Sequence, residues 1–488
     1  MNNKITYVVA IVCTLFSVIS CDDYLEITPE GQQNSENYFN TAQDYQDALV
    51  GVYDLLSTTA LNNILGEIAS DNTFCGGENP TDVLDWQQID DMIHTPDNGA
   101  LRSIFQWMYA GISRANYIVE FQDKIDFDGK QQLLAENLFL RSYYYFELVK
   151  FFGDVPLYTE RRITLEETQT IDRTPKAEVY AKIETDLIQA ISSLPWQQGV
   201  KGRATKGAAY ALLGKIYLFQ EKYDQAADAF NKVIVSGQYQ LVSDFTTIFL
   251  NSNENNIESV FEVQYSGSQE GASFGCFQCL EGNFAVGFMG PRFRDGDYTP
   301  YASGFSFNVP VQDLVDSYDA SDTRKETTIF DIDAFVASRP DVTYNTGSEH
   351  TGYFNKKYIP YADDVVLPDA NINRSNNYRA IRYSDVLLMA AEANLMATTQ
   401  LNNPQDLLDM VRDRAFGNTS NRVTATLDNI LQERKLELAG EGHWFFDQVR
   451  TGKTNTISGF TTGKNEVFPI PRIEIELAGN RWTQNQGY

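Results

Sequence analysis

Two glutamates near the C-terminus are the residues of this chain best placed to do chemistry. Glu437 and Glu441 lie four positions apart, so one face of a helix would carry both carboxylates. An enzyme can use such a pair by raising the pKa of one carboxyl until it serves as a general acid. The charged residues around the pair also suit a structural ion-pair network: Arg434, His443, Asp447 and Arg450. We favour the network, which would lock this segment to Arg382 or Glu392 across a helix interface.

Three aspartates form a second acidic cluster. Asp316, Asp319 and Asp322 are spaced by three residues, and Arg324 follows them. An EF-hand calcium loop needs alternating ligands and a central glycine, which this spacing lacks. We therefore expect these aspartates to cap helices and form salt bridges.

The cysteines favour neither a metal centre nor a disulfide framework. Of the five in the chain, Cys276-Phe-Gln-Cys279 has the spacing of a metal or redox pair, but no second such pair follows. Only three histidines are present, so a zinc site is poorly supplied. No glycine-rich phosphate loop, nucleophile elbow or HExxH motif occurs. We expect an isolated pair or one local disulfide, no metal and no cofactor.

The net charge of the chain restricts the classes of partner that it can bind. With 38 Lys and Arg against 66 Asp and Glu, the net charge is −28. A chain this acidic repels phosphate backbones, so nucleic acid is not an expected partner. Solubility and an uncharged or cationic ligand are compatible with this charge.

Helical periodicity dominates from Thr41 to about Val235. Its clearest unit is Tyr210-x2-Leu213-Gly214-x2-Tyr217 followed by Tyr223, Ala226 and Phe230, which is the tetratricopeptide spacing. In that pattern Gly and Ala permit a close helix crossing and Phe fills the gap. One repeat cannot bury its own faces, so partner helices are needed. The candidates are Ile104–Phe121, Leu133–Phe152, Val179–Ser193, Tyr383–Leu395 and Leu427–Ala439. The aromatic run after Arg141 predicts that one of them is a buried packing helix.

The residue composition and periodicity of the sequence change between Tyr265 and Phe307. This stretch holds eight glycines and ten Phe or Tyr with no helical period, which predicts irregular loops and short strands. Residues 331–376 are similarly broken, helices resume at Arg382, and the tail is extended. The predicted fold is mainly α, a tetratricopeptide-like helical scaffold with an irregular, loop-rich insert that carries short strands.

The N-terminus predicts export and lipidation. Lys4 precedes an uncharged run from Ile5 to Ser20, the pattern of a secretory signal. The cut site Val18-Ile19-Ser20-Cys21 looks like a bacterial lipobox, in which the cysteine carries a diacylglycerol. Two or more lipid chains would hold the protein at a membrane almost permanently. We expect Cys21 to be the lipidation site.

Several stretches spread along the chain resemble the SusD/RagB family, the nutrient-binding outer-membrane lipoproteins of Bacteroidetes. They are Cys21-Asp-Asp-Tyr-Leu25, Leu140-Arg-Ser-Tyr-Tyr-Tyr-Phe146, Phe152-Gly-Asp-Val-Pro156, Arg382-Tyr-Ser-Asp-Val-Leu-Leu-Met-Ala-Ala-Glu392, Glu433-Arg434, Gly440-Glu-Gly-His-Trp-Phe-Phe-Asp-Gln-Val-Arg450, Phe468-Pro-Ile-Pro471 and Gln484-Asn-Gln-Gly-Tyr488. Two positions depart from the family pattern, with Gln486 where proline is frequent and Trp444 where arginine is common. Neither departure disturbs the resemblance.

The resemblance implies a fold, a location and a partner. It implies a helical tetratricopeptide scaffold with an irregular binding face, held at the outer-membrane surface and docked over a SusC-like TonB-dependent transporter. Asp22 and Asp23 look like the family's surface-export signal. The expected parts are a signal peptide, a lipid-tethered arm, a helical region, an irregular binding region and a C-terminal helical region with an extended tail: 1–20, 21–40, 41–260, 261–380 and 381–488.

A sugar site needs exposed aromatic rings beside polar side chains, because sugars present flat C–H faces flanked by hydroxyl groups. Two regions of the sequence offer that mixture, and the corresponding loops of relatives contribute to the binding face. Trp86 is the leading stacking platform. The full candidate set is Trp86, Tyr298 and Tyr301 for stacking and Asp71, Asn72 and Arg292 for hydrogen bonds.

The expected function is non-catalytic capture of a glycan for delivery to the transporter. A peptide-binding member of the same family is one alternative, because an acidic face suits cationic peptides. A lipid-anchored hydrolase that uses Glu437 and Glu441 is a second. An assembly scaffold without a small ligand is a third, since tetratricopeptide repeats commonly bind proteins.

Overall fold

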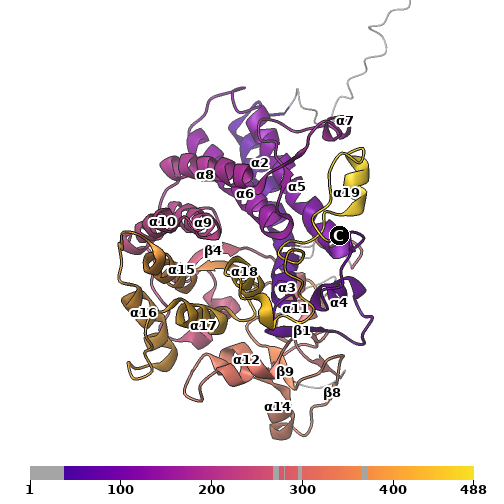
Figure 1. Cartoon of the computed structure of the whole chain (residues 1–488), viewed down its shortest axis with the longest axis vertical. Coiled ribbons are helices and arrows are strands. Elements are labelled where there is room, and N and C mark those ends of the chain that lie inside the picture. The colour runs from indigo at the N-terminus through magenta and orange to yellow at the C-terminus, as the bar shows by residue number, and fades with distance from the viewer. Residues whose placement is uncertain (1–37, 268–273, 280, 295–298, 365–368, 370) are drawn as a thin grey trace, which may run out of the picture.

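The computed structural model describes residues 38–267, 274–279, 281–294, 299–364, 369 and 371–488 (Figure 1). In the N-terminal half the helices are α2 (Ala42–Asp54), η2 (Leu55–Thr59), α3 (Ala60–Ile68), α4 (Leu84–Asp90), α5 (Gly99–Glu120), α6 (Lys130–Phe152), α7 (Leu165–Thr168), α8 (Lys176–Ser193), α9 (Lys206–Phe219) and α10 (Tyr223–Val235). The helices that follow are η3 (Phe245–Thr247), η4 (Asn251–Asn253), η5 (Phe277–Cys279), α11 (Phe284–Phe288), α12 (Gln312–Ser317), α13 (Lys325–Thr328), α14 (Ile332–Ser338), α15 (Tyr383–Met396), α16 (Pro404–Phe416), α17 (Leu427–Leu438), α18 (Trp444–Arg450), η6 (Thr454–Thr456) and α19 (Arg472–Leu477).

The helices pack in an order that links the two ends of the chain. Neighbours in space run from α5 through α6, α8, α9 and α10 to α15, which packs against both α16 and α17 (Figure 1). The C-terminal helices therefore continue the stack that the N-terminal helices begin. The five predicted partner helices correspond to α5, α6, α8, α15 and α17. This arrangement supplies the neighbours that a single repeat lacks.

The crossing of α9 and α10 depends on a glycine. A Cβ atom at Gly214 would lie 2.5 Å from Cε1 of Phe230. The two helices can approach only because that position has no side chain, and the Phe230 ring, which is fully buried, fills the space. The roles that the repeat spacing predicts for this glycine and phenylalanine are confirmed.

Helix α6 is buried along most of its length, as the sequence predicts. Tyr144 and Tyr145 have no exposed surface. The buried guanidinium of Arg141 forms a 2.6 Å ion pair with Asp186 of α8. Burying that charge is tolerable because its partner neutralises it and the carbonyl of Thr159 and the amide oxygen of Asn116 accept further hydrogen bonds.

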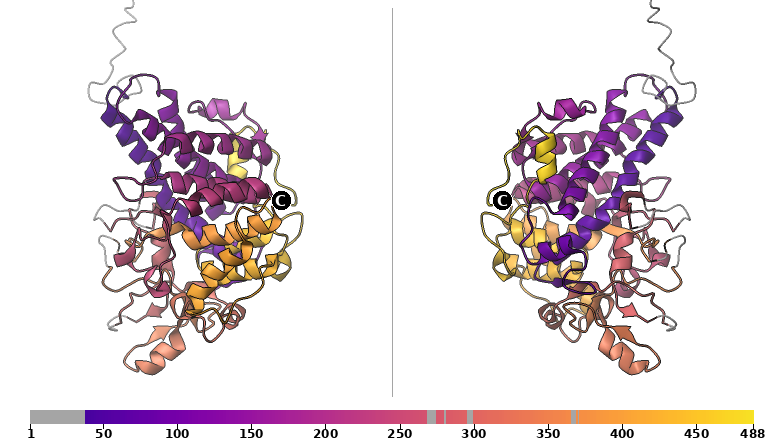
Figure 2. Two further views of the ribbon diagram at one scale, coloured as in Figure 1. Left: turned by 90° about the vertical axis from the view of Figure 1, so that its left-hand side faces the viewer. Right: turned by 90° about the vertical axis from the view of Figure 1, so that its right-hand side faces the viewer.

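The strands are short and pair over long distances in sequence. The strands are β1 (Thr73–Gly76), β2 (Val155–Pro156), β3 (Arg173–Thr174), β4 (Ser259–Val263), β5 (Arg292–Phe293), β6 (Phe307–Pro310), β7 (Ile329–Asp331), β8 (Tyr344–Asn345), β9 (Tyr353–Asn355) and β10 (Tyr378–Arg382). Within the described residues they form antiparallel pairs, of which β1–β6 and β4–β10 tie the loop-rich segment to the scaffold. Figure 2 shows this segment on one side of the lower half and α15, α16 and α17 on the opposite side.

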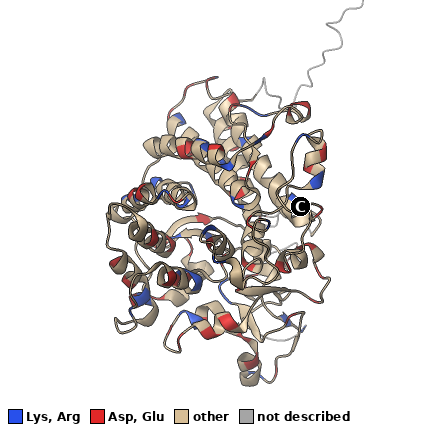
Figure 3. Ribbon diagram, in the orientation of Figure 1, with Lys and Arg blue, Asp and Glu red and all other residues tan. Residues whose placement is uncertain are grey.

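Acidic and basic side chains are interspersed over the ribbon rather than gathered on separate parts (Figure 3). Of the helices that the structure describes, none has the length and apolar character that crossing a bilayer requires. Cys21, the predicted signal and all of the predicted arm except residues 38–40 lie outside the described residues.

Candidate functional site

An aromatic pocket of about 590 Å³ lies between the N-terminal helices and the loop-rich segment. Its side chains come from α3, α4 and α5 on one side and from residues 274–307 on the other. We call it the aromatic pocket, and its rings are those of Trp86, Trp107, Phe274, Phe277, Phe284, Phe288, Phe305 and Phe307. A cavity of this size and composition is typical of a small-molecule site.

Trp86 forms part of the pocket wall and is only 4% exposed. Its ring centroid lies 4.8 Å from that of Phe288 and 5.2 Å from that of Phe307, in tilted and edge-to-face geometry. Such contacts fix the orientation of the indole. Trp107 on α5 is more exposed and also lines the pocket.

Local sequence places the phenylalanines. The side chain of Asn283 caps α11 by accepting a hydrogen bond from the Ala285 amide at 3.2 Å. The short helix then puts Phe284 and Phe288 one turn apart on the same face. Phe307 is placed by the β1–β6 pairing, in which it lies opposite Gly76.

Gly76 is required for that pairing. Its φ is +80°, a left-handed conformation that favours glycine, and a Cβ atom there would lie 2.2 Å from the Ser306 carbonyl oxygen. Since β1 and β6 are far apart in the chain, this contact brings the aromatic residues of the loop-rich segment against α4.

The polar part of the pocket comprises Arg292, Glu78, Asp82, Asp85 and Ser103. The Nη2 of Arg292 donates to Asp82 Oδ2 at 3.0 Å and to the Phe305 carbonyl at 2.8 Å. Its Nε is buried and has no hydrogen-bond partner within the described part of the chain. Asp85, which also lines the pocket, accepts from the Gly99 amide at 3.1 Å at the start of α5. Burial raises the pKa of the Asp85 carboxyl.

A disulfide borders the pocket. Cys276 is bonded to Cys279, and Phe277 lies between them. The Phe277 ring centroid is 4.7 Å from that of Phe284. Of the two expected arrangements, an isolated pair of cysteines or one local disulfide, the disulfide is the one present. Cys75 is a free, buried cysteine.

The structure brings together two of the six predicted ligand-binding residues, Trp86 and Arg292. Asp71 lies elsewhere, where its Oδ1 accepts a 2.6 Å hydrogen bond from the Trp444 indole. Asn72 is fully buried. Tyr301 is half-buried in a separate aromatic cluster, 5.0 Å from the Phe330 ring. Tyr298 is outside the described residues.

The sequence distinguishes few of the pocket's rings individually. Trp107 lies in a helix whose apolar period is that of ordinary packing, so nothing distinguishes it locally. The six phenylalanines fall in the aromatic and glycine-rich stretch that the sequence marks as irregular. The density of Phe in that stretch was the available signal.

Glu437 and Glu441 are structural. Both are fully buried. Arg382 contacts both of them, through Nη1 to Glu437 at 2.8 Å and Nη2 to Glu441 at 2.8 Å. Burial alone would raise the pKa of the Glu437 carboxyl, but Arg414, Arg382 and Arg324 outweigh it and hold that pKa well below its usual range. An inaccessible carboxylate that stays ionised cannot act as a general acid.

The rest of this charged segment is equally engaged. The predicted partner Glu392 pairs with Arg450 at 2.5 Å, so the expected locking of this segment is confirmed. Asp322 pairs with Arg324 at 2.7 Å, and Asp319 accepts the Ser321 amide at 2.8 Å. The predicted salt bridge is therefore present at Asp322. The predicted helix capping is wrong, because Val311 and Arg324 stand at the N-caps of α12 and α13 without a side-chain hydrogen bond and Asp319 makes a turn contact instead.

Comparison with known proteins places the chain. Residues 23–218 match the family described as "Starch-binding associating with outer membrane", and residues 333–467 match the family described as "SusD family". A solved structure named "Laminarin binding SusD-like protein" is 34% identical, with 91% of this chain and 99% of that chain covered and a TM-score of 0.82.

The chain belongs to the SusD/RagB family.

Other SusD-like proteins support this assignment. Surface glycan-binding protein A from Bacteroides thetaiotaomicron, solved in complex with laminarihexaose, is 26% identical with a TM-score of 0.82, over 91% of this chain and 99% of that one. SusD-like protein P2 of Formosa agariphila is 27% identical over 99% of each chain. The predicted mainly α fold of the SusD/RagB family is confirmed. At the level of the family, glycan binding is supported by these relatives.

Proposed function

We propose that this SusD/RagB protein binds a glycan of the laminarin type in the aromatic pocket and does not cleave it. The observation that carries the proposal is the pocket itself, whose lining combines Trp107 and several phenylalanines with Arg292. Aromatic rings pack against the C–H faces of sugars. The Arg292 guanidinium has five N–H groups, of which Nη2 donates to Asp82 and to the Phe305 carbonyl, so this partly exposed side chain has donors left for a sugar hydroxyl. Binding proteins for laminarin and laminarihexaose among its relatives support this ligand class.

The absence of cleavage is part of the proposal. Glycoside hydrolysis needs two carboxyl groups that flank the bond, one of them free to give a proton. Three carboxyl groups line the aromatic pocket. Asp82 is paired with Arg292 and Asp85 accepts from the Gly99 amide at the start of α5, which leaves Glu78 alone and not the pair that hydrolysis needs. Glu437 and Glu441, the alternative pair, are buried in ion pairs.

The proposal extends to location and partner. The protein would be lipid-anchored through Cys21 at the cell surface and would pass its glycan to a SusC-like TonB-dependent transporter. The lipobox-like sequence and the outer-membrane description of the matching family support this. The alternatives of a peptide ligand and of a pure scaffold would both leave the aromatic pocket without a sugar.

Calorimetric titration with laminarihexaose tests the site. We expect Trp107→Ala to lower the affinity at least tenfold, because a desolvated aromatic contact contributes about 1.5 kcal/mol or more. Tyr217→Ala, which removes a partly exposed aromatic ring outside the aromatic pocket, is the control and should bind as the parent does. Equal binding by the parent and Trp107→Ala would move the site elsewhere. Release of shorter sugars during incubation would overturn the non-catalytic assignment.

A further inference from the structure

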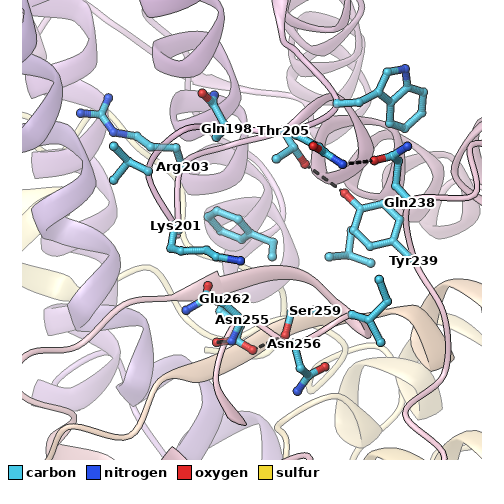
Figure 4. Close-up of a pocket in the computed structure, with 17 residues that line it drawn as sticks. Gln198, Lys201, Arg203, Thr205, Gln238, Tyr239, Asn255, Asn256, Ser259 and Glu262 are labelled. Atoms are coloured by element: carbon cyan, nitrogen blue, oxygen red, sulfur yellow. Dashed lines mark hydrogen bonds between the residues drawn. The ribbon is translucent and has the colours of Figure 1, made fainter. Parts of the chain in front are cut away.

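A second pocket, of about 420 Å³, shares none of its residues with the aromatic pocket. We call it the polar pocket. It lies between the α8–α9 loop, the segment after α10, and the residues that lead into and form β4 (Figure 4). Its polar lining residues are Gln197, Gln198, Lys201, Arg203, Thr205, Gln238, Tyr239, Asn255, Asn256, Ser259 and Glu262.

Two of the three charged lining residues are neutralised by the protein. Arg203 donates to Glu136 at 3.1 Å. Glu262 is buried, and its Oε2 accepts hydrogen bonds from the Asn255 amide at 2.9 Å and the Asn377 side chain at 3.1 Å. The Arg379 guanidinium lies 3.8 Å from the same carboxylate. Neither charge is available to a ligand.

Lys201 differs from these two. Its side chain is exposed and makes no ion pair or hydrogen bond with any residue that the structure describes. Figure 4 shows it extending across the pocket between Arg203 on one side and Asn255 and Glu262 on the other. The pocket therefore presents one uncompensated ammonium group in a protein whose net charge is −28.

The groups around this ammonium are neutral and held in place. The Gln197 amide donates to Gln238 at 2.8 Å, and the hydroxyls of Thr205 and Tyr239 lie 3.1 Å apart. Each keeps further donor or acceptor capacity, because an amide has two donor hydrogens and a hydroxyl has two lone pairs. Trp196 stacks against Tyr210 with centroids 6.0 Å apart and contributes a half-exposed ring to the lining.

We propose that the polar pocket is a second carbohydrate site, which binds a sugar that carries a carboxylate, that is, a uronic acid residue. The carboxylate would pair with Lys201, the fixed amides and hydroxyls would bind the ring hydroxyls, and Trp196 would contact the ring. An ammonium group against a carboxylate gives a stronger hydrogen bond than two neutral groups do. This site is independent of laminarin binding in the aromatic pocket.

The test measures the binding of sodium D-glucuronate and of D-glucose to the whole folded protein by ligand-observed NMR. We expect the parent to bind glucuronate in preference to glucose. Lys201→Met should weaken glucuronate binding roughly tenfold. Lys176→Met, which removes an exposed lysine that lines neither pocket, should bind as the parent does. Since both lysines are exposed, thermal unfolding should match in the two variants.

The proposal is overturned if Lys201→Met binds glucuronate as the parent does. It is equally overturned if the parent binds glucose as well as glucuronate, or if acetate alone competes as well as glucuronate. Loss of glucuronate binding in Trp107→Ala with retention in Lys201→Met would place the acidic sugar in the aromatic pocket and would also contradict it. Failure to bind laminarihexaose leaves this result unaffected, so the two proposals fail separately.

Discussion

At the scale of single residues, the buried charges explain where this protein can and cannot do chemistry. Arg382 is fully buried, and its guanidinium reaches Glu258, Glu437 and Glu441. Each carboxylate in turn has at least one further cation nearby. Because every charge in the group has a partner, the group links α17 to β10. The surrounding cations hold the pKa values of the Glu437 and Glu441 carboxyls below their usual range.

Glu437→Gln should destabilise the protein strongly. The change leaves Arg324, Arg382 and Arg414 short of one buried negative charge, and breaking a buried pair costs about 3 kcal/mol or more. Urea unfolding followed by circular dichroism would measure the loss. Glu166→Gln, at an exposed position, is the control and should change the free energy of unfolding by less than about 0.5 kcal/mol. A small loss in Glu437→Gln would show that the group is not a cooperative network.

Asp90 should make the stability of the folded protein depend on pH. Burial raises the pKa of its carboxyl to about 8, although a 2.7 Å hydrogen bond from the Cys75 amide acts in the opposite direction. An unfolded aspartate has a pKa of about 3.9, so between these values the folded state binds the extra proton. Stability should therefore decrease as the pH rises toward about 8.

Asp90→Asn removes this dependence, because the amide is neutral at every pH. We expect the variant to gain in melting temperature over the parent as the pH is raised from 6 to 9. Differential scanning calorimetry at each pH would measure the difference. Parallel curves for the two proteins would contradict the raised pKa.

At the scale of elements, the contact between α9 and α10 shows how one missing side chain sets a helix crossing. The Phe230 ring occupies the place where a Cβ of Gly214 would be. Neighbouring helices depend on this geometry in turn, because α9 packs against α8 and α10 packs against α15.

Gly214→Ala should destabilise the protein by about 1–3 kcal/mol, since the added methyl group overpacks a fixed core contact. Gly51→Ala is the matched control, because that helical glycine in α2 has nothing within 4 Å of the added Cβ. Alanine there should stabilise by up to about 1 kcal/mol through helix propensity. Chemical unfolding of both variants would decide it, and equal effects would exclude the steric explanation.

The elements that could be predicted from sequence are those whose signal is local. The tetratricopeptide spacing around Gly214 lies within two consecutive helices, and the aromatic run after Arg141 lies within one helix. The aromatic pocket has no such local signal. Trp107 and Phe307 are about 200 positions apart, and long-range contacts such as the β1–β6 pairing and the packing of α11 against α3 bring their segments together. Composition could mark the loop-rich stretch, but which of its rings face the cavity depends on packing.

The same reasoning explains which of the predicted site residues lie in the aromatic pocket and which do not. Trp86 and Arg292 are predicted ligand-binding residues because each stands in a polar stretch of sequence that also carries aromatic residues. The structure places both in the aromatic pocket. Asp71 was selected on the same grounds, but it is held by the Trp444 indole, which is remote in sequence. A long-range partner of that kind cannot be inferred from the residues adjacent to Asp71.

At the scale of the whole molecule, the helical stack forms the frame and the loop-rich segment contributes one side of the aromatic pocket. The main core cluster includes residues from α2 to the C-terminal tail and reaches into the loop-rich segment, where two smaller clusters complete the packing. Two pockets with different chemistry can therefore be positioned relative to one another by a single folded body.

Cys21→Ser should release the protein from the membrane. Without a thioether-linked lipid, the acidic body has no strong affinity for an anionic bilayer surface. Fractionation of cells that express the parent and the variant, followed by immunoblotting, would measure the distribution. Ser20→Ala, which keeps a small residue beside the cysteine, is the control and should stay with the membrane. Equal membrane recovery of the parent and Cys21→Ser would contradict lipid anchoring.

The bond between Cys276 and Cys279 has a practical consequence for production of this protein. It forms in oxidising compartments, and glutathione keeps cytosolic thiols reduced. Material prepared in bacterial cytosol, or stored with dithiothreitol, would carry an open pair on either side of Phe277, one of the rings that line the aromatic pocket. Affinities measured on such preparations would understate those of the oxidised protein, so the thiol content of each batch should be assayed before any titration.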